Sequence, residues 1–196
     1  TLPTMNNPYI GNATSYLIEV FLGLFVFALL LRFILQWVRG DFYNPIGEFL
    51  VKFTNPIVIP LRRIIPGFSG LDIATLLATI GFSFAKTWLI LQIAGAQTAP
   101  FGLFIYSIAE MLKLAVYIFM GALIIRIVAS WIAPHAAYSP IMSPIYALSE
   151  PMMSQARKII PDFGGIDLSP ILIFVFLNLT QMLAIAPLYA LARQYM

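Results

Sequence analysis

The chain has no cysteine, a single histidine and few charged residues. Without cysteine it can form no disulfide, thiolate metal site or cysteine nucleophile. With only His135, a multi-histidine metal site or a bis-histidine haem site cannot be built within one chain, and we expect this loop histidine to be solvated. Paired carboxylates, a glycine-rich phosphate loop and a nucleophile–base arrangement are also missing, so we expect no enzymatic activity and no cofactor.

Charge is scarce because apolar residues dominate. Only 10% of the 196 residues are charged, whereas a water-soluble domain carries about a quarter. The mean hydropathy is +0.91. A membrane-spanning helix needs roughly 20 mostly apolar residues, and four stretches qualify, at about 16–38, 73–93, 104–132 and 168–192. We therefore predict an all-α integral membrane protein with four transmembrane helices.

The basic residues gather in the two long connections between spans, and the short connection between the second and third spans has none. They are Arg39, Lys52, Arg62 and Arg63 in the first long connection and Arg157 and Lys158 in the second. Connections rich in lysine and arginine stay in the cytoplasm. We therefore predict that both long connections lie in the cytoplasm and both termini on the periplasmic or outer side.

Each half of the chain repeats the other. LLLRFILQW at 29–37 matches LIIRIVASW at 123–131, at an offset of 94 residues. Further along, PLRRIIPGFSGLD at 60–72 matches QARKIIPDFGGID at 155–167, at an offset of 95. Because each unit holds two spans, both units insert in the same orientation, as a parallel tandem repeat. We predict a first repeat at 1–98 and a second at 99–196.

These repeated features resemble the YggT family of small bacterial and plastid membrane proteins. They are an arginine before a tryptophan near the span end, the x-Pro turns at 44–45 and 139–140, and the P-x-R-R-I-I-P-x-F-x-G-x-D phrase. The second half departs from this pattern at Glu150, Gln155 and Lys158. The resemblance implies links to cell division and nucleoid distribution, to osmotic tolerance and, in plastid relatives, to cytochrome haem attachment. It implies no enzymatic activity.

Each long connection contains two segments that open with proline, at 45 and 56 in the first and at 140 and 151 in the second. A polar residue followed by proline suits the N-cap and the first position of a helix. We therefore predict two short amphipathic helices in each connection, lying in the membrane interface. The basic pairs then lie at headgroup level; they are Arg62, Arg63, Arg157 and Lys158.

Three roles stay open for these four basic residues. They set topology and contact anionic lipid headgroups, at roughly 1 kcal/mol per basic residue. Alternatively, they form a docking surface for an acidic partner, or they line a substrate or ion funnel. The chain carries no signal for nucleic-acid binding. We expect its partners to be membrane lipids and another membrane protein or further copies of itself.

Asp72 and Asp167 directly precede the second and fourth spans. We expect them to cap these helices, because a carboxylate suits a helix N-terminus. The alternative is that they pair with basic groups such as Arg32 and Arg126, which lie inside the first and third spans. An arginine there either snorkels to the surface or pairs within the bundle.

Four further ionisable residues fall in the outer halves of the spans: Glu19, Lys86, Glu110 and Lys113. Glu110 and Lys113 are three residues apart and share one helix face. We expect Lys86 to lie near Glu19 or Glu110, because an unpaired ammonium at that depth is costly. This intramembrane polar cluster either joins the first three spans or forms a proton or cation site.

Together these features favour a non-enzymatic membrane scaffold or assembly factor that docks lipids or protein partners through a symmetric basic cytoplasmic face. The alternative is a small ion or solute channel that contributes to osmotic balance. A scaffold needs a complementary surface, whereas a channel needs a continuous polar route through the bundle.

Overall fold

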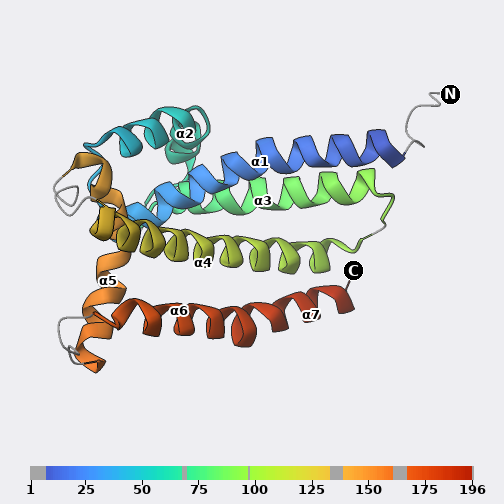
Figure 1. The fold of residues 1–196 in the computed structure, drawn as a ribbon. Coiled ribbons are helices and arrows are strands. Elements are labelled where there is room, and N and C mark those ends of the chain that lie inside the picture. Colours follow the sequence, from blue (N-terminus) through green and yellow to red (C-terminus); the bar gives the residue numbers. More distant parts are fainter. Residues whose placement is uncertain (1–7, 68–69, 97, 133–138, 161–166, 196) are drawn as a thin grey trace.

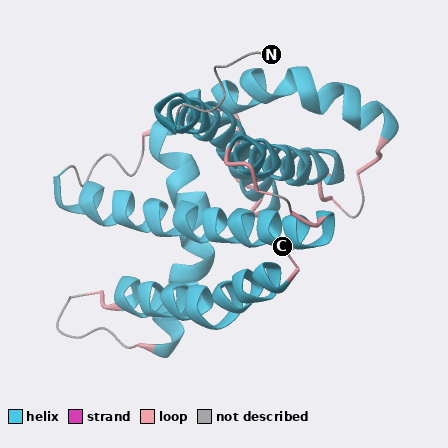
Figure 2. Ribbon diagram, turned by 90° about the vertical axis from the view of Figure 1, so that its right-hand side faces the viewer, coloured by secondary structure: helices cyan, strands magenta, loops and turns pink. Residues whose placement is uncertain are grey.

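The computed structural model describes residues 8–67, 70–96, 98–132, 139–160 and 167–195. All regular structure within these ranges is helical (Figure 2), which confirms the all-α class. His135 and residues 68–69 and 161–166 of the two repeated phrases lie outside the described residues. Four helices are long and apolar enough to cross a membrane, as expected for a multi-pass membrane protein: Tyr9–Trp37, Ile73–Ile93, Pro100–Ile132 and Ser169–Gln194.

The four long helices lie side by side in one bundle (Figure 1). Within each half, the first long helix packs antiparallel against the second, and α3 and α4 join the two halves. The long helices are α1 (Pro8–Trp37), α3 (Ile73–Ile93), α4 (Pro100–Ile132) and a last span built from α6 (Ser169–Thr180), η3 (Gln181–Ile185) and α7 (Ala186–Gln194). The π-helical turn η3 precedes Pro187, whose missing N–H disturbs regular winding.

Two shorter helices lie across one end of the bundle, opposite the described ends of the chain (Figure 1). They are α2 (Pro45–Ile64) and α5 (Ser143–Ile159), the latter preceded by the 3-10 turn η2 (Pro140–Met142). The two long connections therefore meet at the same end of the molecule, as a parallel repeat requires.

Buried leucines hold the long helices together. Leu29 and Leu35 on α1 and Leu103 and Leu123 on α4 are almost fully buried. Large apolar side chains on the outward faces remain exposed, for example Leu183 at 74%. Such an apolar periphery matches a bundle that is surrounded by lipid, and small and polar residues are buried between the helices beside the leucines, for example Ala78 and Ser83.

The prediction of two short helices in each long connection is wrong. Helix α2 continues through Pro56 and Pro60, and α5 continues through Pro151. Asn44 does cap α2, because its side chain accepts a hydrogen bond from the Gly47 amide at 2.8 Å. The residues before the internal prolines begin no new helix. Asn55, before Pro56, instead accepts a hydrogen bond from Arg32 of α1, and Glu150, before Pro151, pairs with Arg126 of α4.

Candidate functional site

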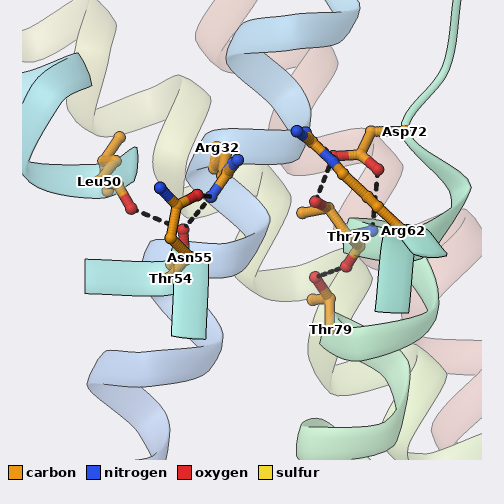
Figure 3. A network of polar contacts seen from close by, with 8 residues as sticks. All are labelled: Arg32, Leu50, Thr54, Asn55, Arg62, Asp72, Thr75 and Thr79. Carbon is orange, nitrogen blue, oxygen red and sulfur yellow. Dashed lines mark hydrogen bonds and ion pairs between the residues drawn. The ribbon is translucent and has the colours of Figure 1, made fainter. Parts of the chain in front are cut away.

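In the first repeat, Asp72 joins the end of α2 to the start of α3. Arg62 donates to Asp72 Oδ2 through Nε at 3.2 Å and Nη2 at 2.5 Å. The Thr75 amide donates to Oδ1 at 3.2 Å, and the Thr75 hydroxyl donates to Oδ2, as Figure 3 shows. Burial raises the pKa of Asp72, but the hydrogen bonds from Arg62 and Thr75 outweigh it and hold that pKa below its usual range.

The second repeat forms the same link between α5 and α6. Arg157 donates to Asp167 Oδ2 through Nε at 3.0 Å and Nη2 at 2.9 Å, and the Ser169 amide donates to Oδ1 at 2.9 Å. Burial raises the pKa of Asp167, but the hydrogen bonds from Ser169 and Arg157 outweigh this effect, so the pKa lies below the usual carboxyl value. Both aspartates therefore bind helix N-terminal amides, as expected. Their ion-pair partners are Arg62 and Arg157, so the alternative pairing with Arg32 and Arg126 is wrong.

Arg32 joins α1 to α2 through neutral oxygens and forms no ion pair with a residue that the structure describes. Its side chain is buried, and Nη1 donates to Thr54 Oγ1 at 2.6 Å and to Asn55 Oδ1 at 3.0 Å (Figure 3). The Thr54 hydroxyl in turn donates a hydrogen bond to the Leu50 carbonyl oxygen at 2.6 Å. Arg32 thus pairs within the bundle rather than snorkelling to the surface.

Arg126, the equivalent arginine of the second repeat, has stronger partners. Nη1 donates to Ser149 Oγ at 3.0 Å, and Nη2 lies 2.6 Å from Glu150 Oε2. Its guanidinium carbon lies 4.6 Å from the ring centroid of Tyr146. Glu150 Oε1 is also 3.6 Å from Arg157 Nη1, so this one carboxylate bridges two arginines.

Among the described residues, two of the four predicted docking residues form ion pairs and two do not, although Lys158 donates to the neutral Gln155 Oε1 at 3.4 Å. Arg62 and Arg157 pair with Asp72 and Asp167 as described above. Arg63 and Lys158 are exposed on the last turns of α2 and α5, and neither forms an ion pair with a residue that the structure describes. These last two are therefore the cations free to meet a ligand.

The partners of the span arginines were not predicted. Asn55 and Glu150, each directly before a proline, are predicted to cap a new helix instead, and Thr54 and Ser149 carry no predicted role. A signal was present: Thr54 follows Arg32 by 22 residues and Ser149 follows Arg126 by 23. A hydroxyl residue at nearly constant separation from an arginine in both halves is a candidate partner. No comparable signal marks Tyr146.

The intramembrane polar cluster lies near the other end of the bundle. Lys86 Nζ lies 2.9 Å from Glu19 Oε1, and Lys113 Nζ lies 3.7 Å from Glu110 Oε1. The Tyr189 hydroxyl donates to Glu110, which brings α7 into the network and was not predicted. These four charged residues line a cavity of about 360 Å³ between α1, α3 and α4. Among the described residues, no group of acidic or histidine side chains could hold a metal ion.

The CCB3/YggT family model matches residues 11–93 and 105–188, so it matches twice and covers both arginine networks. The chain belongs to the CCB3/YggT family. The two matches support the tandem repeat, while the boundaries 1–98 and 99–196 stay predictions. No solved structure matches this CCB3/YggT chain.

Bacterial relatives match the CCB3/YggT chain over nearly its whole length. An uncharacterized protein of Pseudomonas aeruginosa is 41% identical over 184 residues, which are 93% of each chain. The uncharacterized protein YggT of Escherichia coli is 32% identical over 171 residues, covering 87% of this chain and 88% of that relative. The chloroplastic YlmG homolog protein 2 of Arabidopsis thaliana is 39% identical over 61 residues, or 31% of this chain and 24% of the relative.

Proposed function

We propose that this CCB3/YggT protein is a non-enzymatic scaffold or assembly factor of the bacterial inner membrane. Both termini lie outside, and the end formed by α2 and α5 faces the cytoplasm. This face docks anionic lipid headgroups or a membrane protein partner. The resemblance to the YggT family suggests that the docking serves cell division or osmotic tolerance.

The observation that carries this proposal is the placement of α2 and α5 across one end of the bundle (Figure 1). This placement brings the last turns of both helices, with Arg63 and Lys158 exposed, to the same end of the bundle. Exposed cations beside an anionic leaflet gain about 1 kcal/mol each. At the opposite end, the basic residue of the last turn is Arg193 alone.

The test compares the lipids and proteins bound to the full chain in mild detergent. Wild type should retain phosphatidylglycerol above its share of the bulk membrane. Replacing Arg63 and Lys158 together with glutamine should lower this enrichment, and the matched variant Arg193→Gln should keep it. Photo-crosslinking from positions 63 and 158 should capture the same protein. No lipid enrichment and no shared crosslink in wild type would reject docking at this face.

A second function, an ion or solute pathway, is favoured by the charged cavity of the polar cluster. Two carboxylates and two ammonium groups line about 360 Å³ within the spans, where charges are usually functional. The test is flux of protons, potassium or sodium into vesicles that contain the purified chain. Wild-type flux no greater than that of empty liposomes would exclude conduction of these ions.

A further inference from the structure

The first repeat contains an open cavity of about 600 Å³ at the α2 end of the bundle, between the end of α1 and α2. Three arginines line it: Arg32, Arg39 and Arg62. Asn55 and Gln36 add neutral polar groups, and the remaining walls include the apolar side chains of Phe42, Val51 and Ile59. A strongly basic pocket with apolar walls is shaped for an amphiphilic or phosphate-bearing anion rather than for a cation.

Acidic side chains neutralise only part of this charge. Asp72 pairs with Arg62, but neither Arg32 nor Arg39 forms an ion pair with any residue that the structure describes. Arg32 is only 3% exposed and donates to two neutral oxygens. Asp72 attracts Arg32 only from a distance, because it pairs directly with Arg62. A buried guanidinium that is bonded only to neutral oxygens is costly, since removing a cation from water requires an opposite charge to offset it.

The second repeat shows which groups the first repeat lacks. There, the carboxylate of Glu150 bridges Arg126 and Arg157, and the ring of Tyr146 covers the Arg126 guanidinium. At the offset of 95 residues, Glu150 corresponds to Asn55 and Tyr146 to Val51. The second repeat therefore supplies its own anion and aromatic face, whereas the first leaves the equivalent position beside Arg32 uncharged.

Arg39 adds a third cation at an unusual backbone position. It has φ +57°, in the left-handed region that favours glycine. Its amide donates to the Gln36 carbonyl and the Gly40 amide donates to the Leu35 carbonyl, which together form a Schellman ending of α1. Glycine is the usual residue at this position, and the corresponding residue of the second repeat is Ala133. An arginine in this strained backbone conformation suggests that its charge has a role.

We propose that the first-repeat cavity binds a phosphate group of net negative charge. The phosphate oxygens lie between Arg32 and Arg62, at the position that corresponds to the Glu150 carboxylate of the second repeat. Arg39 completes the basic lining of the cavity. The group comes from an anionic phospholipid headgroup or from a soluble phosphate compound. This inference rests on the proposed docking function and deepens it. It adds a specific binding site in the cavity to the surface docking by the exposed Arg63 and Lys158.

The experiment uses the full chain in neutral detergent and the variant Asn55→Glu. This change gives the first repeat the carboxylate that the second already has, and Asn55→Gln is the matched control that keeps an amide. The probes are dioctanoyl phosphatidylglycerol, dioctanoyl phosphatidylcholine and inorganic phosphate, measured by titration calorimetry and native mass spectrometry. Thermal melting checks that each variant is folded, so weaker binding is not mistaken for unfolding.

Wild type and Asn55→Gln should bind phosphatidylglycerol, and Asn55→Glu should weaken that binding about tenfold or more, a loss of about 1.4 kcal/mol. If inorganic phosphate competes equally well, the ligand is soluble; if it does not compete, the ligand is a lipid. Equal binding by wild type and a folded Asn55→Glu variant, or no binding of any phosphate probe, overturns the inference. Binding that is lost with Arg63 and Lys158 but unaffected by Asn55→Glu overturns it too, yet supports docking at the surface.

Discussion

The ammonium of Lys86 on α3 lies 2.9 Å from the carboxylate of Glu19 on α1. The lysine side chain is 10% exposed, whereas that of the glutamate is 54% exposed. The pair therefore joins the two long helices of the first repeat, with its lysine buried and its glutamate exposed. The second repeat has no such pair, because Gln181 corresponds to Lys86 and Lys113 to Glu19.

Replacing Lys86 with methionine should destabilise the bundle. The change strands the Glu19 carboxylate among apolar spans, and an unsatisfied charged group costs about 1–3 kcal/mol or more. Replacing Glu19 with leucine in the same chain should restore much of the lost stability, since a buried pair is often dispensable as a unit. Thermal unfolding of both variants in detergent measures the difference.

The control for this pair is Lys113→Met. Lys113 lies 3.7 Å from Glu110, but Glu110 keeps the hydrogen bond from Tyr189. Losing Lys113 should therefore cost less than losing Lys86. If the double variant at 86 and 19 melts as low as Lys86→Met alone, the pair is not the structural link described here. If it is folded but loses ion flux that wild type shows, the cluster serves conduction.

The two capping aspartates provide a matched comparison of the repeats. Asp72 has a side chain 4% exposed and receives bonds from Arg62 and Thr75, whereas Asp167 is 34% exposed. Asp72→Asn should lower the free energy of unfolding by about 1–3 kcal/mol, because it leaves a charged donor beside a weaker acceptor. Asp167→Asn should cost less. Equal losses would show that burial does not decide the strength of these links.

Acid should weaken the same two links. The pKa of Asp72 and that of Asp167 lie below the usual carboxyl value in the folded state. Their stabilisation is complete above the ordinary pKa of about 4 and is lost as pH falls through the lower folded-state pKa. Unfolding measured from pH 6 to pH 3 should show wild type losing more stability than the Asp72→Asn variant. Parallel losses would contradict this linkage.

The sequence predicted the parts of the fold that hydropathy and repetition specify. Four apolar runs of sufficient length became four long helices, and Asp72 and Asp167 both bind amides at the start of a span, as the repeated phrase predicts. Their ion pairs with Arg62 and Arg157 were not predicted. Asn44 was also interpreted correctly as a helix cap. These features depend on local chemistry or on sequence patterns that occur in both repeats, so they can be predicted without knowing how the helices pack.

Apart from the repeated spacing between each span arginine and a hydroxyl residue, the arginine networks could not be predicted, because they depend on packing. Proline after Asn55 and after Glu150 suggested a helix start, but α2 and α5 continue through these prolines because the helices lie at the bundle end, where tertiary contacts outweigh local preference. Which face of α2 meets α1 then decides that Thr54 and Asn55 reach Arg32. Similarly, only the packing of α7 on α4 brings Tyr189 to Glu110.

Membrane topology can be tested by labelling single cysteines, because the natural chain has none. Tyr43 is 93% exposed at the α2 end of the bundle, and Ala99 is exposed in the short connection at the opposite end. With the basic connections in the cytoplasm, a membrane-impermeant maleimide should label Ala99→Cys in intact cells and Tyr43→Cys only after the membrane is opened. Labelling of Tyr43→Cys but not Ala99→Cys in intact cells would reverse the orientation and place Arg63 and Lys158 outside. The proposed docking to the anionic cytoplasmic leaflet would then fail, while phosphate binding in the first-repeat cavity, measured in detergent, would still be decided by Asn55→Glu.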